Sequence, residues 1–225
     1  MSDEPGALAL FGAATWAGSS ELAAQLIASA GGEVVALPTG AAYEMPSLAI
    51  ERLGESLAEL GATIHPVMVL TRRDAEVAEY AEVVRSASLI CLTGGSPLHL
   101  MSVMKDSLVL TALIAAWRDG ATVIGAEGGA SVLSDPMIDP RGGALTVGLG
   151  LVRDLSVYVG YRGEIDAGLE RTLALAADDC PVVAIGADGG VVRDPDGIWR
   201  TEGAVTIFQQ AVPVDLTALA GKRLA

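Results

Sequence analysis

The chain has 225 residues, of which 51% are hydrophobic and only 4% aromatic, and its formal net charge is −14. This acidic balance excludes a nucleic-acid-binding surface, because phosphate recognition requires clustered Lys and Arg. No uninterrupted apolar run is long enough to span a membrane, and the acidic residues 1–5 lack the features of a signal peptide. We therefore expect a cytoplasmic protein that binds neither nucleic acid nor membranes.

The length fits one α/β domain, and no internal repeat or flexible linker divides the chain. We therefore expect residues 1–225 to form a single domain. Cys91 and Cys180 lie far apart in apolar segments, which indicates two reduced core residues rather than a disulfide. The two histidines and two cysteines do not form a metal-binding pattern, and we expect no metal or other cofactor.

Short apolar runs alternate with longer amphipathic segments up to residue 125, which indicates βαβ units and a largely parallel sheet. In chain order, the pattern predicts strands at residues 7–11, 33–37, 63–70, 88–92 and 122–125. It predicts helices at residues 20–30, 46–60 and 74–85, and one interrupted helical segment at 97–105 and 108–118.

The pattern changes after residue 134, where prolines and glycines predict an irregular loop. A strand at residues 155–158 and a helix at residues 165–177 follow. The C-terminal part is rich in hairpins, because residues 194–197 (Asp-Pro-Asp-Gly) are a strong turn signal. Antiparallel strands are expected at residues 181–186, 191–193, 198–201 and 204–208.

The segment Gly125-Ala126-Glu127-Gly128-Gly129-Ala130 has the composition of a nucleophile elbow. Such an elbow is a sharp strand-to-helix turn whose central residue has a strained backbone, so small residues are needed on both sides. Glu127 occupies the central position, where a hydrolase with this turn carries its nucleophile. An ordinary Gly-rich connection between a strand and a helix has a similar composition and remains an alternative.

Two further glycine-containing segments follow predicted strands. Thr93-Gly94-Gly95-Ser96 lets peptide N–H groups approach a ligand closely, as an oxyanion hole requires, although such turns are common. Residues 11–18 follow the first strand as a phosphate-binding loop would, which leaves a nucleotide- or flavin-binding module as a third hypothesis. This loop lacks both Gly-x-Gly-x-x-Gly and the Lys-Ser/Thr pair of a P-loop.

The order of these motifs resembles the dipeptidase E and cyanophycinase family of serine peptidases. That family shows a strand ending in Thr-Gly-Gly, then a Gly-x-Ser-Ala-Gly-Ala elbow at the spacing found here, and then a Gly-Leu-Gly-Leu segment. The matching positions are Thr93-Gly94-Gly95, Gly125 to Ala130, Gly148-Leu149-Gly150-Leu151, the Pro38-Thr39 turn and the hairpins after Ala184-Ile185-Gly186-Ala187-Asp188.

The resemblance covers nearly the whole chain and implies a class I glutamine amidotransferase-like fold. We therefore expect a three-layer, flavodoxin-like, mostly parallel sheet with helices on both faces and C-terminal antiparallel hairpins. The family's catalytic serine falls on Glu127, and its catalytic histidine falls on Gly160 by an ungapped count. His65 and His99 do not match that position. Because a serine peptidase needs both groups, the family mechanism cannot operate with these residues.

The leading hypothesis is a non-catalytic pseudoenzyme that binds a small molecule or a short peptide. Glu127 would then neutralise the elbow's N–H groups or recognise an amine. The expected binding residues are Gly94, Gly95, Ser96, His99, Gly128, Gly160 and Tyr161. The apolar composition and the family also favour a homodimer.

The alternative is a hydrolase with changed chemistry, in which Glu127 acts as nucleophile or general base. A second group would have to activate water, and the family's topology brings four candidates near the pocket. They are His99, Tyr161, Glu164 and Asp188. Ser131 follows the centre of the elbow by one helical turn, and we expect it to point away from the site.

Overall fold

The computed structural model describes residues 5–13 and 20–225. Its helices are α1 (Glu21–Ser29), α2 (Pro46–Ala58), α3 (Ala78–Ser86), α4 (Pro97–Met104), α5 (Leu108–Arg118), α6 (Gly128–Leu133) and α7 (Ala167–Leu175). Short 3-10 helices span Thr39–Ala41, Asp74–Glu76 and Leu216–Leu219.

The long strands of the first part of the chain are β1 (Leu8–Phe11), β2 (Glu33–Leu37), β3 (Thr63–Pro66), β4 (Leu89–Leu92) and β5 (Thr122–Ala126). Four very short strands follow, namely β6 (Ser134–Asp135), β7 (Met137–Ile138), β8 (Leu145–Thr146) and β9 (Val152–Arg153). The remaining strands are β10 (Ser156–Val159), β11 (Val182–Ile185), β12 (Gly190–Arg193), β13 (Trp199–Glu202), β14 (Val205–Gln209) and β15 (Val212–Val214).

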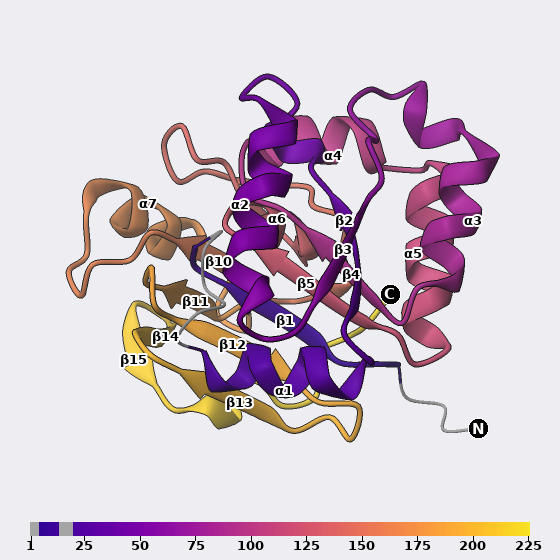
Figure 1. The fold of residues 1–225 in the computed structure, drawn as a ribbon. Coiled ribbons are helices and arrows are strands. Elements are labelled where there is room, and N and C mark those ends of the chain that lie inside the picture. Colours follow the sequence, from indigo (N-terminus) through magenta and orange to yellow (C-terminus); the bar gives the residue numbers. More distant parts are fainter. Residues whose placement is uncertain (1–4, 14–19) are drawn as a thin grey trace.

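Within the described residues, seven strands form the central sheet in the order β13-β12-β1-β5-β4-β2-β3. The five strands from β1 to β3 in this order are parallel, whereas β12 and β13 are antiparallel to their neighbours. A second sheet has the order β10-β11-β14-β15. The C-terminal strands, coloured orange to yellow, lie together on one side of the molecule (Figure 1).

The central sheet is buried on both faces, and alternate residues of each strand face opposite sides. In β1, Leu8 and Leu10 belong to one core cluster with α3, α4, α5 and α6, whereas Ala9 and Phe11 belong to a second cluster with α1 and α2. This period-two alternation gives the three layers visible in Figure 1. The expected three-layer α/β fold with a mostly parallel sheet is confirmed.

The second sheet has its own covering helix. Leu169 and Leu173 of α7 pack on Val182, Ala184 and Phe208 of that sheet. The opposite face of the sheet contributes Val183, Ile185 and Ile207 to the cluster that contains α3 to α6. The C-terminal hairpins are therefore divided between two sheets, which the strand pattern did not indicate.

Some element boundaries differ from the sequence expectations. The third strand ends at Pro66 instead of residue 70, and the helix expected at residues 74–85 is interrupted at Val77, whose backbone is extended (φ −78°, ψ 118°). The carboxylate of Asp74 accepts hydrogen bonds from the N–H groups of Leu70 and Thr71, which stabilises the turn that leads into the 3-10 helix at Asp74–Glu76. Strand β15 was not expected.

Among the described residues, no single helix is both long and apolar enough to cross a membrane. One bent pair of helices, α4 and α5, reaches the required length and composition only when combined, and the two helices meet at 94°.

Candidate functional site

Glu127 lies between β5 and α6 and has a strained backbone conformation (φ 49°, ψ −115°). Few non-glycine residues adopt a positive φ, and this region persists only where the surroundings enforce it. Its N–H donates to the carbonyl of Phe11 at 2.9 Å, and its carbonyl accepts from the N–H of Ala130 at 3.0 Å. Hydrogen bonds on both sides therefore fix this turn at the carboxyl edge of the central sheet.

Glycines allow the turn at Glu127 to pack directly against the turn between β4 and α4. A methyl group on Gly128 would lie 2.1 Å from the carbonyl oxygen of Gly95, and one on Gly129 would lie 2.3 Å from that of Leu92. Gly95 itself has a positive φ of 107° and packs against Gly40. Three segments that follow strands β2, β4 and β5 thus meet in main-chain contact, which requires glycine.

A cavity of about 350 Å³ lies on one side of Glu127. Its polar side chains belong to Glu127, Ser131 and Tyr158, and the rest of its wall is apolar or glycine. The lining also includes Gly12, Gly95, Pro97, Gly128, Ile138, Pro140, Val157, Val159 and Gly160. We call this space the larger site cavity.

A second cavity, of about 240 Å³, lies between Glu127 and α2, and we call it the smaller site cavity. Glu127 and Gly95 line both cavities, whereas Gly94 lines only the smaller one. A methyl group on Gly94 would lie 2.2 Å from Oε2 of Glu127. The Glu127 carboxylate therefore lies against Gly94, on the wall of the smaller site cavity.

The other charged residues that line the smaller site cavity come from α2 and the loop before it. They are Arg52 and Glu44, both exposed. No ion pair or hydrogen bond joins the Arg52 guanidinium to another described residue. Neither residue was expected at the site from the sequence. The one sequence feature that points to Arg52 is its position beside the row of apolar residues on its helix.

The expected binding residues separate into two groups. Gly94, Gly95, Gly128 and Gly160 line the two site cavities. Ser96, His99 and Tyr161 do not. The Ser96 hydroxyl caps α4 by accepting from the N–H of His99 at 3.2 Å, and Tyr161 packs edge-on against Phe208. These two side chains have structural contacts of their own.

Neither histidine lies in a site cavity. Nε2 of His99 bonds to the carbonyl oxygen of Leu70 at 2.9 Å, and its ring packs edge-on against Tyr43 at 4.8 Å between centroids. His65 is exposed on the edge strand β3 and pairs with Glu33. Glu164 and Asp188 are also exposed and line neither cavity. The four groups expected to activate water therefore line neither site cavity; they are His99, Tyr161, Glu164 and Asp188.

Ser131 lies in the larger site cavity together with Glu127, so the expectation that it points away from the site was wrong. The two residues are four apart, and positions four apart share one face of a helix. The N–H of Ser131 donates to the carbonyl of Glu127 at 3.1 Å, which continues the helical geometry back to the turn.

Tyr158 is a further residue of the larger site cavity that was not expected from the sequence. Burial, together with a hydrogen bond to Asp166 at 2.8 Å, raises the pKa of its phenol to about 12. Burial also raises the pKa of the Cys91 thiol to about 12. Both groups are therefore protonated at neutral pH. Cys91 and Cys180 are free and buried, as expected.

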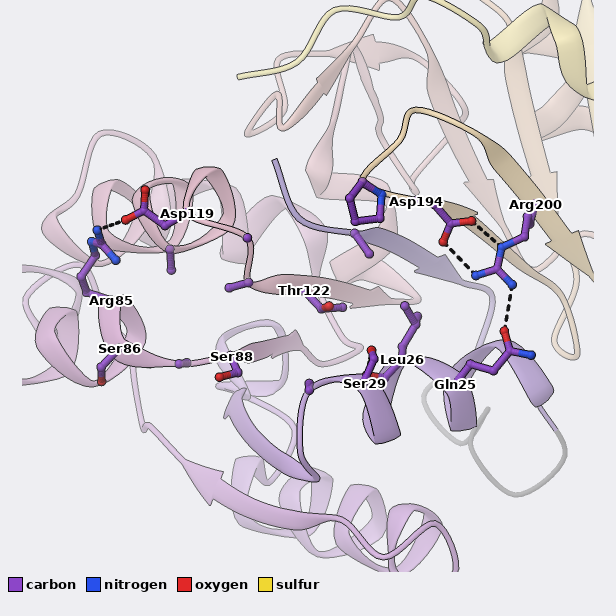
Figure 2. A pocket seen from close by; sticks show the side chains of 17 residues that line it. Gln25, Leu26, Ser29, Arg85, Ser86, Ser88, Asp119, Thr122, Asp194 and Arg200 are labelled. Carbon is purple, nitrogen blue, oxygen red and sulfur yellow. Dashed lines mark hydrogen bonds and ion pairs between the residues drawn. The ribbon is translucent and has the colours of Figure 1, made fainter. Parts of the chain in front are cut away.

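A third cavity, of about 800 Å³, lies at the opposite, amino edge of the sheet (Figure 2), and we call it the amino-edge cavity. Arg85 pairs with Asp119 on one side of it. On the other side, Arg200 binds both carboxylate oxygens of Asp194, at 2.5 and 2.8 Å, and donates to Gln25 at 2.9 Å. Both arginines that line this cavity thus already have carboxylate partners.

Within residues 5–13 and 20–225 no cluster of three or more His, Cys, Asp or Glu side chains could hold a metal ion. The loop considered as a phosphate-binding segment falls largely on residues 14–18, which lie outside the described residues.

The sequence model of peptidase family S51 matches residues 10–145 of this chain, which include the turns at Gly94 and Glu127. The chain belongs to peptidase family S51. This match confirms the expected membership in the dipeptidase E family.

Two solved structures are similar to this member of family S51. A peptidase from an acI-B1 Actinobacterium superposes with a TM-score of 0.83 at 22% identity, covering 99% of this chain and 98% of the other. A peptidase E candidate from Listeria monocytogenes EGD-e superposes with a TM-score of 0.63 at 16% identity, covering 91% and 98%. At these identities the likeness supports the fold. A comparison with curated proteins gives no match.

Proposed function

We propose that this family S51 protein is a pseudoenzyme that binds a small amine-bearing ligand or a short peptide through the Glu127 carboxylate. The observation that carries the proposal is the position of Glu127 at the centre of a strained turn, with its carboxylate on the wall of a cavity. In our interpretation the turn is a nucleophile elbow in which Glu127 replaces the family's serine.

The surroundings of Glu127 favour binding over catalysis. Gly160, at the expected position of the family's histidine, lines the larger site cavity and supplies no base. The phenol of Tyr158, whose pKa is raised to about 12, stays protonated at neutral pH and cannot act as a base there. The Glu127 carboxylate lies on the wall of a cavity that is partly lined by apolar side chains such as Leu48 and Leu53. Such a carboxylate favours a cation, since charge-assisted hydrogen bonds are strong where water is partly excluded.

The binding proposal can be tested by calorimetric titration with n-butylamine. We expect Glu127→Gln to weaken binding roughly ten- to hundredfold, because a hydrogen bond to a charged group is worth about 1.5–3 kcal/mol. Glu164→Gln, an exposed residue outside both cavities, is the matched control and should leave the affinity unchanged. Equal affinities of wild type and Glu127→Gln would contradict the proposal.

Peptide hydrolysis by the same pure protein gives the second readout. We expect no turnover of Asp-X dipeptides or cyanophycin. Turnover that persists in Glu127→Gln would contradict a pseudoenzyme, because another residue would then perform the chemistry.

The second candidate is a hydrolase that uses Glu127 as nucleophile or base. The strained backbone favours it, because such strain is typical of residues held ready for chemistry. Turnover that Glu127→Gln abolishes, together with a covalent adduct on Glu127 in mass spectrometry, would support this candidate over the first.

We also propose that residues 1–225 form one domain. The supporting observation is the continuity of the core cluster on the α3–α6 face of the sheet, which includes residues from Leu8 to Leu219.

A further inference from the structure

The smaller site cavity carries a pattern of charge that is more specific than an amine site. The carboxylate of Glu127 lies on one wall, against Gly94. Arg52 and Glu44 contribute from the α2 side of the same cavity. The cavity therefore combines two carboxylates with one guanidinium, and its complement is a ligand with two positive groups and one negative group.

Helix α2 presents Arg52 to this cavity as part of one face. The helix residues that line the cavity are Leu48, Ala49, Arg52 and Leu53. Arg52 follows Leu48 by four residues and Ala49 by three, which are the spacings of a single helical face. The other members of this face are apolar, so Arg52 supplies the one cation among the described residues of the lining.

The Arg52 guanidinium is available for a ligand. It is exposed, and no described residue pairs with it, in contrast to Arg200 and Arg85 at the opposite end of the sheet. A guanidinium has a planar set of donors that matches both oxygens of a carboxylate. Arg52 can therefore bind a ligand carboxylate without first breaking an ion pair with a described residue.

The volume limits the size of the ligand. At about 240 Å³, the cavity is smaller than the roughly 300–1,000 Å³ of pockets that hold drug-sized molecules. A free amino acid is of suitable size, whereas a longer peptide would have to extend beyond the cavity. Leu48 and Leu53 provide apolar wall for the aliphatic part of such a molecule.

We propose that the smaller site cavity binds a free basic amino acid, with its carboxylate on Arg52 and its two ammonium groups on Glu127 and Glu44. This inference rests on the proposed function, because it uses Glu127 as the binding carboxylate. It adds a selectivity that a simple amine site lacks: the ligand must also carry a carboxylate.

Calorimetric titration with three related probes tests this selectivity. L-lysine carries all three groups, cadaverine is lysine without the carboxylate, and L-norleucine lacks the side-chain amine. We expect L-lysine to bind at least tenfold more tightly than either of the other two. Equal affinities for L-lysine and cadaverine would overturn the proposal, as would the absence of L-lysine binding at millimolar concentration.

Variants then assign each group. Arg52→Gln should weaken L-lysine at least tenfold and leave cadaverine unchanged, whereas Glu44→Gln should weaken both L-lysine and cadaverine, each of which carries two ammonium groups. Arg171→Gln, an exposed arginine on α7 outside both cavities, is the matched control.

If n-butylamine binding still depends on Glu127 but Arg52→Gln leaves L-lysine unaffected, this inference is wrong while the proposed function stands. If n-butylamine binding is also independent of Glu127, both are wrong.

Discussion

The amino and carboxyl edges of the central sheet both carry a cavity with charged side chains, but those side chains are arranged differently. At the amino edge, Arg200 binds Asp194 through two hydrogen bonds and Arg85 pairs with Asp119 (Figure 2). At the carboxyl edge, Arg52 has no ion-pair partner among the described residues, and the backbone of Glu127 has a positive φ.

Cavity size and the availability of charged side chains therefore differ independently between the two edges. The amino-edge cavity is more than twice as large, at about 800 Å³ against about 350 Å³, yet its arginines are already neutralised. Strain at one non-glycine residue costs on the order of 1–3 kcal/mol and persists only where the surrounding structure enforces it. The turn at Glu127 keeps this strained backbone conformation, as residues of binding and catalytic sites commonly do.

The largest expected effect concerns glycines at the two edges. Gly129→Ala should lower the free energy of unfolding by about 3 kcal/mol, because its new methyl group would lie 2.3 Å from the Leu92 carbonyl oxygen. Gly120→Ala, at the amino edge, meets no atom within 4 Å and should cost only about 1 kcal/mol for its positive φ of 105°. Urea unfolding measures both. Equal losses would show that main-chain contact at the carboxyl edge is not what requires glycine.

A smaller effect is expected for the amino-edge ion pairs. Asp194→Asn should lower the free energy of unfolding by about 1 kcal/mol, since it removes a two-point contact with a half-buried arginine. Asp119→Asn, in a more exposed pair, should cost less than about 0.5 kcal/mol. Neither variant should alter the affinity for n-butylamine. Weaker amine binding by Asp194→Asn would move the ligand site to the amino edge.

The smallest effect is a pH dependence beside the larger site cavity. Hydrogen bonds from Arg141 lower the pKa of Asp139 from 3.8 to about 2, in the loop that also contains the lining residue Pro140. Because the pKa is lowered in the folded state, this stabilisation is complete above about pH 4 and is lost as the pH falls towards 2. Between pH 5 and 2 the melting temperature should therefore fall slightly less steeply for Asp139→Asn than for wild type. Parallel curves would contradict this assignment.

The fold could be predicted from the sequence because its strongest signals are local. The strand Glu33–Leu37 lies at its predicted residues, since an apolar run ends at Pro38. The helix expected at residues 74–85 begins only at Ala78, because the backbone is extended at Val77 and residues 74–76 form a separate 3-10 helix. An interruption of this kind is local too, but it depends on a backbone conformation that apolar periodicity does not show.

The tight turn at Glu127 could also be predicted from the sequence, whereas the walls of the cavities beside it could not. The glycines around Glu127 indicate a tight turn through local composition alone. Arg52 and Glu44 line a cavity together with Glu127 only because α2 packs on the sheet face that includes residues of β2 and β4, which is a long-range result of folding. The assignment of Ser131 failed for a different reason, because residues four apart on a helix were treated as facing apart.

The most direct test of the proposed binding site is a crystal structure of the protein soaked with L-lysine. We expect a non-covalent ligand in the smaller site cavity, with an ammonium group within hydrogen-bond distance of the Glu127 carboxylate and a carboxylate on Arg52. A ligand bound at the amino-edge cavity instead, or continuous electron density joining Glu127 to a ligand atom, would contradict it.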